Sequence, residues 1–176
     1  MIFQHLGKNN KIKVFRGSEN NVLDRFYKTA KFYKANWIVR ITADCPLIDP
    51  DIVDRGIEIF KSENYDYVTN TFPRTFPDGN ETEIFSFKAL DTAFFNSNLP
   101  SEHEHVTPYF YKHPDDFKIH NFSLPQNLNY IQLSVDTKQD MDNFAATISQ
   151  MKRVHWEYTL DDILEIHSRL LLKNDR

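Results

Sequence analysis

The sequence has 176 residues, of which 40% are hydrophobic and 26% are charged, a composition that can build a packed domain and excludes a wholly disordered chain. Its 21 Lys and Arg against 25 Asp and Glu give a formal net charge of −4, which argues against a protein that binds nucleic acid through its phosphates. One cysteine excludes a disulfide framework, and no apolar run reaches the roughly 20 residues that a membrane span needs, so we expect a single cytoplasmic domain over residues 1–176.

The first 70 residues alternate between strand patterns and helix patterns. Short runs of alternating or β-branched residues predict strands at 11–15, 37–42 and 65–70. Apolar residues at helical spacing predict one helix from about residue 21 and another that begins with Asp49 as its N-cap and Pro50 as its first residue. This order of elements predicts right-handed crossovers and a parallel sheet.

The second half of the chain is less regular and opens with a long loop over residues 71–82. Further strands are predicted at 83–87, 117–122 and 130–135. One helix is predicted over 88–98. A second is predicted to start at a capping box of Ser101 and Glu104 and to end or kink at Pro108. Two more are predicted to start at Thr137 and at Thr159. The expected fold class is α/β, with a mostly parallel, mixed sheet flanked by helices.

Polar residues follow several predicted strands at their carboxyl ends, where open α/β sheets bind ligands. Residues 16–18 follow the first strand, Asp44 the second, Asn70 the third and Asp136 the last. Two carboxylates from different strands can share one Mg²⁺ whose remaining ligands are substrate phosphates. The alternative is that Asp44 caps a turn before a proline and that Asp136 caps the helix after it.

Other chemically suggestive residues favour structural roles. His103 and His105 are two residues apart and so point to different helix faces, which argues against a metal site with Glu104. Cys45 has no adjacent base and is interpreted as a small packed residue. The loop residues Phe72 and Phe76 are candidates for the wall of a pocket. The chain contains neither a Gly-x-Gly-x-x-Gly motif nor a Walker-type loop.

Five strings of residues carry a resemblance to a known family. They are Arg16-Gly17-Ser18-Glu19 with residues 22–26, then residues 40–48, then Pro77-Asp78-Gly79 with Glu83, then residues 104–109, and last Val135-Asp136-Thr137 with Asp140. In this order they resemble the cytidylyltransferase-like family of the spore coat polysaccharide biosynthesis protein F. That family is related to the synthetases that activate 3-deoxy-octulosonate and acylneuraminate as CMP-sugars. The match runs from about residue 11 to about residue 165.

The resemblance implies a Rossmann-like fold of the nucleotide-diphospho-sugar transferase type. It implies Mg²⁺-dependent transfer of CMP from CTP to a sugar acid, with release of pyrophosphate. By family position, Asp44 and Asp136 are the catalytic, metal-binding pair. The residues that border the nucleotide are Arg16, Gly17, Ser18 and Arg25. Those on the sugar side are Asp78, Gly79, Glu83, Glu104 and His105.

One departure from the family pattern changes the expected activity. The family opens with a segment of the type Arg-x-Gly-Ser-x-Arg-x-Pro-x-Lys that cradles the triphosphate, and these 176 residues do not contain it. The pattern therefore predicts an N-terminally truncated member that is inactive by itself. A metal-dependent glycosyltransferase and a non-catalytic remnant or interaction module are the alternatives. CTP and a sugar acid are the expected partners, a homodimer is left open, and neither nucleic acid nor a membrane is expected.

Overall fold

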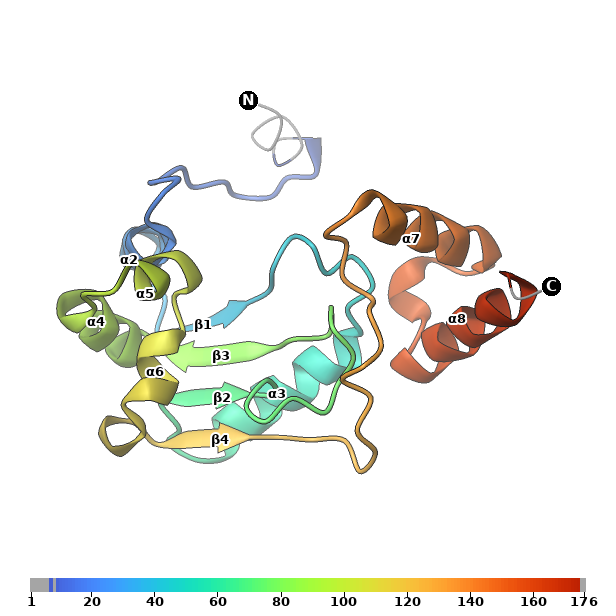
Figure 1. Cartoon of the computed structure of the whole chain (residues 1–176). Coiled ribbons are helices and arrows are strands. Elements are labelled where there is room, and N and C mark those ends of the chain that lie inside the picture. Colours follow the sequence, from blue (N-terminus) through green and yellow to red (C-terminus); the bar gives the residue numbers. More distant parts are fainter. Residues whose placement is uncertain (1–6, 8, 175–176) are drawn as a thin grey trace. The chain divides into compact units, whose positions relative to one another are not determined.

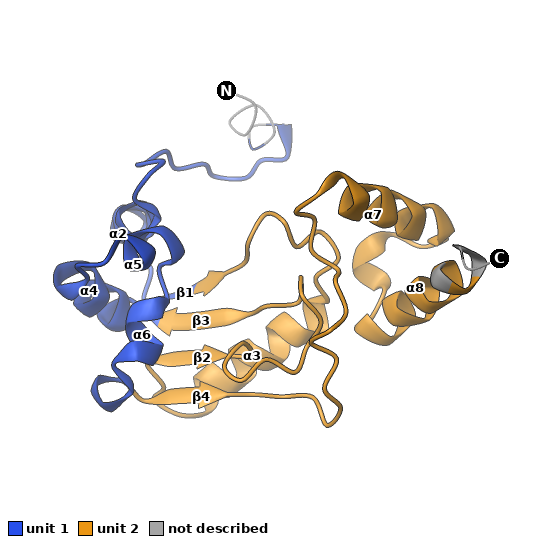
Figure 2. Cartoon of the chain, in the orientation of Figure 1, with its two compact units in different colours: residues 1–38, 86–117 blue, residues 39–85, 118–176 orange. Residues whose placement is uncertain are grey.

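The computed structural model describes residue 7 and residues 9–174 (Figure 1). The chain divides into two compact units, coloured separately in Figure 2. Unit 1 combines residues 1–38 with 86–117, and unit 2 combines 39–85 with 118–176. Among the described residues, unit 1 contains helices and the ends of two strands, whereas unit 2 contains the rest of the sheet and three α-helices. No helix within residues 9–174 is long and apolar enough to cross a membrane.

Four α-helices with defined bounds lie between residues 21 and 117 of unit 1. They are α2 (Val22–Tyr33), α4 (Phe87–Asn96), α5 (Pro100–His105) and α6 (Pro108–Lys112), followed by the 3₁₀ turn η1 (Pro114–Asp116). Helix α2 starts where the Asn21 side chain accepts a hydrogen bond from the Asp24 amide, which satisfies a free N–H of the first turn. Tyr27 of α2 stacks on Phe94 of α4 with 4.0 Å between ring centroids, so an aromatic contact joins these two helices.

Two sequence-based expectations for unit 1 are wrong. Residues 11–15 form no strand, and Ile12 and Val14 are exposed, because the alternating segment has no neighbouring strand to pair with. The predicted capping box is shifted: α5 begins at Pro100, and the Glu102 carboxylate accepts hydrogen bonds from the Asn98 and Leu99 amides. The end of that helix before Pro108 is confirmed, and Pro108 becomes the first residue of α6.

The sheet is mixed, which confirms the expected α/β class. Its strands lie in the order β1 (Trp37–Arg40), β3 (Glu83–Ser86), β2 (Tyr67–Thr69) and β4 (Ile119–Asn121). Strand β2 pairs in parallel with β4 and antiparallel with β3, so Val68 lies opposite both His120 and Ile84. Figure 1 shows β3 running against the other three strands. The expected strand at 130–135 is wrong: its one bridge pairs Gln132 with Asp78, because residues 131–133 bond to a loop instead of a strand.

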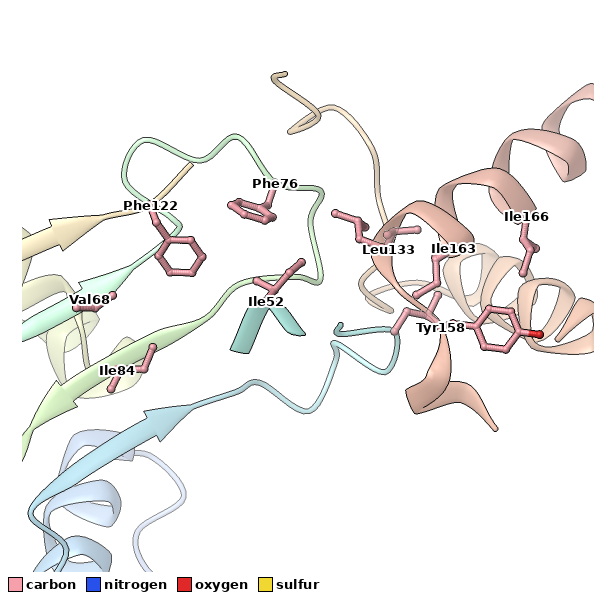
Figure 3. Close-up of a cluster of buried hydrophobic side chains, with 11 residues drawn as sticks. Ile52, Val68, Phe76, Ile84, Phe122, Leu133, Tyr158, Ile163 and Ile166 are labelled. Atoms are coloured by element: carbon pink, nitrogen blue, oxygen red, sulfur yellow. The ribbon is translucent and has the colours of Figure 1, made fainter. Parts of the chain in front are cut away.

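Helices α3 (Pro50–Ser62), α7 (Lys138–Gln150) and α8 (Leu160–Asn174) complete unit 2, with the 3₁₀ turn η2 (His155–Glu157) before α8. The predicted N-caps Asp49 and Thr137 are confirmed. The buried core joins residues of the sheet and α3 to residues of α8 (Figure 3). Phe76 belongs to this core, edge-on to Phe122 with 5.7 Å between centroids, so it does not wall a pocket. The core thereby anchors the loops that follow β1 and precede α7.

Candidate functional site

The two predicted metal-binding residues lie on neighbouring segments of unit 2. The carbonyl oxygen of Asp44 accepts a hydrogen bond from the Val135 amide at 2.8 Å. The segment that follows β1 and the segment that leads to Asp136 therefore run side by side. Both carboxylates are on exposed residues. The placement of Asp44 and Asp136 after β-rich runs predicted this proximity, although they are 92 positions apart in the sequence.

The Asp136 carboxylate accepts hydrogen bonds from residues of its own segment, and the neighbouring Thr137 caps helix α7. Its Oδ2 atom accepts hydrogen bonds from the Gln132 side-chain amide at 3.1 Å and the Ser134 hydroxyl at 3.0 Å. The cap of α7 is Thr137, which forms a capping box with Asp140. The alternative in which Asp136 caps α7 is therefore wrong, and its carboxylate is fixed at the end of an extended segment.

Asp44 carries an ionised carboxylate at neutral pH. A hydrogen bond from Thr42 is the largest of the influences that lower the pKa of Asp44 below its ordinary value, and the Arg40 guanidinium contributes a smaller one. Helix α3 has its own N-cap, Asp49, five residues after Asp44, and begins at Pro50. The ionised form of an exposed carboxylate is the form that binds a hard cation.

The loop with Asp78 and Gly79 packs against the segment that carries Asp136. Asp78 donates its amide to the Ile131 carbonyl at 2.9 Å and accepts from the Leu133 amide at 2.8 Å. Gly79 has φ +96°, and a Cβ added there would lie 2.6 Å from the Ser134 nitrogen. Only glycine tolerates both the conformation and this close approach. The structure thus brings Asp78 and Gly79 next to the Asp136 segment.

Two charged residues of this loop escaped the sequence-based prediction. Arg74 pairs with Asp78 at 2.8 Å and with Glu81 at 3.1 Å, and Glu81 also accepts from the Gly79 amide at 2.8 Å. The one available signal was the spacing of four between Arg74 and Asp78, which is informative in a helix but not in a proline-containing loop. Together they hold the loop in a defined shape beside Cys45, whose sulfur lies 3.8 Å from Glu81 Oε2.

Glu83, predicted on the sugar side, is buried within the sheet. Its Oε2 atom accepts from Arg40 and its Oε1 atom from the Tyr67 hydroxyl, each at 2.5 Å. Both carboxylate oxygens are therefore occupied by the chain itself. A direct contact between Glu83 and a sugar stays a prediction, and the geometry gives this residue a visible role in joining strands.

The remaining predicted residues belong to unit 1. Arg16, Gly17 and Ser18 precede α2, and Arg25 of that helix donates from Nη1 to the Ser18 carbonyl at 2.9 Å. Ser18 Oγ accepts from the Asn21 amide at 3.0 Å, which fixes the segment onto the helix. Glu104 and His105 are exposed on α5, with 4.0 Å between carboxylate and ring nitrogen. Their nucleotide and sugar roles stay predictions.

The donor set in unit 2 fits magnesium better than a metal that needs several protein ligands. The described residues contain no group of three or more His, Cys, Asp or Glu side chains placed to hold a metal ion. Mg²⁺ needs only one or two carboxylates when phosphates and waters complete its shell. Asp44 and Asp136 supply hard oxygen ligands of that kind, so the residues present fit this ion.

Known proteins are similar to this chain over most of its length. A family model described as Cytidylyltransferase matches residues 2–174. An uncharacterized protein of Methanocaldococcus jannaschii is 41% identical over 131 residues, which are 73% of this chain and 53% of that protein. The spore coat polysaccharide biosynthesis protein SpsF of Bacillus subtilis is 33% identical over 137 residues, which are 76% of this chain and 56% of that protein. This chain spans about half the length of these curated relatives.

A solved structure extends the likeness to the fold. The structure of a cytidylyltransferase from Leptospira borgpetersenii superimposes with a TM-score of 0.91 and 31% sequence identity. The likeness covers 97% of this chain and 71% of that one. The α/β architecture and the family resemblance carried by the five sequence strings are both confirmed.

Proposed function

We propose, on the premise that this chain belongs to the cytidylyltransferase family, that it acts in the transfer of CMP from CTP to a sugar acid. The observation that carries the proposal is the family match over residues 2–174. The relative from Bacillus subtilis is named for spore coat polysaccharide biosynthesis, which supports a CMP-sugar made for a surface polysaccharide. In this reaction a sugar hydroxyl attacks the α-phosphorus of CTP, and the bond to the β-phosphate breaks to release pyrophosphate.

The site in unit 2 supports this chemistry through positioning and charge. Asp44 and Asp136 would hold Mg²⁺, which when bound neutralises charge on the phosphates. Asp44 and Asp136 come from segments joined by the backbone bond to Val135, so their spacing is set before substrate binds. Pre-set charges lower the barrier because no reorganisation is needed when charge develops on the phosphoryl oxygens. The Asp78 carboxylate, one oxygen of which pairs with Arg74, is suited to accept a hydrogen bond from a sugar hydroxyl through its other oxygen.

Pyrophosphate release tests the proposal. The 176-residue chain and a chain extended by a phosphate-loop segment of the family type are each incubated with CTP, Mg²⁺ and 3-deoxy-octulosonate or N-acetylneuraminate. We expect release from the extended chain and little from the 176 residues alone. Several missing charge-assisted contacts, each contributing about 1.5–3 kcal/mol, would lower the rate more than a thousandfold.

Two variants serve as comparison. Asp44→Asn should abolish release by the extended chain, whereas Asp142→Asn, an exposed residue of α7 paired with Lys138, should leave it unchanged. Cleavage of a nucleotide-sugar without consumption of CTP would favour the glycosyltransferase alternative. Turnover of neither substrate class by the extended chain would favour the non-catalytic one.

A further inference from the structure

A single buried carboxylate joins three adjacent strands of the sheet. Glu83 begins β3, the strand between β1 and β2, and binds Arg40 on one side and Tyr67 on the other. The side chain of Glu83 is 5% exposed, that of Arg40 is 17% exposed, and Tyr67 is fully buried. Both oxygens of Glu83 are used, so the guanidinium of Arg40 is anchored at one nitrogen in a fixed place.

The guanidinium of Arg40 has more donors than this anchor uses. An arginine side chain carries several N–H groups in a planar fork. Among the described residues, the bond from Nη1 to Glu83 is the one hydrogen bond that this side chain makes. In the part of the chain that the structure describes, the buried side-chain atoms without a partner belong to Asn80, Thr82 and Ser97, so the spare nitrogens of Arg40 are accessible to water or to a ligand. The fork matches two oxygens of a phosphate or a carboxylate.

Arg40 also lies close to the proposed metal-binding residue. It ends β1, four residues before Asp44, at the carboxyl end of the strand that leads to the proposed metal site. A cation beside a metal-binding carboxylate is placed to bind the anionic group that the metal also contacts. The competing explanation is that the Arg40–Glu83 pair only stabilises the sheet.

We propose that Arg40 binds an anionic oxygen group of the substrate, a phosphate or a carboxylate, and that Glu83 is the positioning residue that aims its guanidinium. The identity of the substrate rests on the proposed function, whereas anion binding by Arg40 is measurable without turnover. In this arrangement Glu83 positions the Arg40 side chain and does not contact the sugar itself.

Lysine at position 40 separates the two explanations. An ammonium group can keep the ion pair with Glu83 but cannot offer a planar pair of donors to a ligand. The dissociation constants of Arg40→Lys and Arg40→Gln are measured by calorimetry against inorganic pyrophosphate and against 3-deoxy-octulosonate, each with Mg²⁺. We expect both variants to weaken one of these probes about 10- to 100-fold, with Arg40→Lys keeping a near-normal melting temperature.

Controls and further variants decide what each result means. Arg153→Lys changes an exposed arginine paired with Asp162 at 3.0 Å and should bind both probes normally. Glu83→Gln keeps the guanidinium but removes its charged anchor, and should weaken the probe that Arg40→Lys weakens, by about 3- to 10-fold. Loss of pyrophosphate affinity identifies a phosphate as the ligand, and loss of sugar-acid affinity identifies a carboxylate.

The outcomes also distinguish this inference from the proposed function. Normal affinity of Arg40→Lys for both probes, or no binding of either probe by the unaltered chain, overturns the role of Arg40. Arg40-dependent binding without any transfer of CMP by the extended chain would leave the role of Arg40 standing and overturn the proposed function. Normal CMP transfer and probe affinity in the Arg40→Gln variant would support the proposed function and overturn the role of Arg40.

Discussion

Cys45, directly after Asp44, is held as a protonated thiol. Burial raises the pKa of Cys45 to about 12, and the neighbouring carboxylates of Glu81 and Asp44 add to the rise. The Thr42 hydroxyl lies 2.9 Å from the sulfur. A thiol in this state is a poor nucleophile, which agrees with the interpretation of Cys45 as a packed residue.

Thiol labelling measures this protection. At pH 8 a disulfide reagent should modify folded Cys45 far more slowly than the same residue in the urea-unfolded chain. Between pH 9 and about 12 the unfolded thiol ionises while the folded one stays protonated, so the free energy of unfolding should fall with rising pH in this window. Fast labelling of the folded chain would contradict the buried, protonated state.

Asp49 has two roles that a single substitution removes together. It caps α3 through the Asp51 amide at 2.8 Å and also accepts the Leu160 amide at 2.6 Å. Asp49→Ala should lower the free energy of unfolding by about 2–4 kcal/mol, from the lost cap and a buried amide without a partner. Thr137→Ala removes an exposed cap whose hydroxyl bonds only to Asp140 within the same helical turn, and it should cost about 1 kcal/mol in urea titrations. Equal losses would show that the bond to Leu160 contributes nothing.

At the scale of elements, the start of α5 depends on one buried carboxylate. Glu102 accepts hydrogen bonds from the amides of Asn98 and Leu99 and pairs with Lys112 at 3.4 Å. Burial by itself raises the pKa of Glu102, but these hydrogen bonds and the Lys112 charge outweigh it and hold the pKa below its ordinary value. The ionised form therefore stabilises this turn of unit 1.

The pH dependence of a neutral variant tests that role. A depressed pKa adds stability that is fully present above the unfolded value of 4.5 and is lost as pH falls through the folded value. Glu102→Gln should therefore lower the free energy of unfolding by about 1.5–3 kcal/mol at pH 7 and by less below pH 4.5. Glu104→Gln, on the same helix but 70% exposed, should change little at either pH. A pH-independent loss in Glu102→Gln would refute the argument.

Elements were predictable where their signals are local. The caps Asp49 and Thr137 act within one helical turn, so the sequence alone located the starts of α3 and α7. Strand patterns at 11–15 and 130–135 failed because a strand also needs a partner, which alternation cannot reveal. For the site, Asp44 was predicted from the end of the strand that became β1, and Asp136 from a strand at 130–135 that does not form, so their metal role stays a prediction. The pairing of Arg40 with Glu83 spans 43 residues and leaves no local pattern.

At the scale of the whole molecule, ligand binding should increase the free energy of unfolding. CTP with Mg²⁺ at about 100 times its dissociation constant adds about 2.7 kcal/mol to the free energy of unfolding, which raises the melting temperature by several degrees. The shift should disappear with EDTA or in Asp44→Asn. It should be smaller with ATP, because a cytidylyltransferase distinguishes the base. An equal shift with ATP would contradict CTP specificity.

The hydrogen bond between Asp49 and Leu160 also has a consequence for the time course of synthesis. Its partners are 111 residues apart, and unit 2 is interrupted by residues 86–117. At translation rates of about 5–20 residues per second, roughly 5 to 20 seconds pass between the appearance of Asp49 and that of Leu160 on the ribosome. During that interval one oxygen of the Asp49 carboxylate lacks its final partner, and the core lacks the α8 side chains that complete it. A nascent chain arrested before residue 160 should therefore be cleaved by protease in segments of unit 2 that resist cleavage in the released protein.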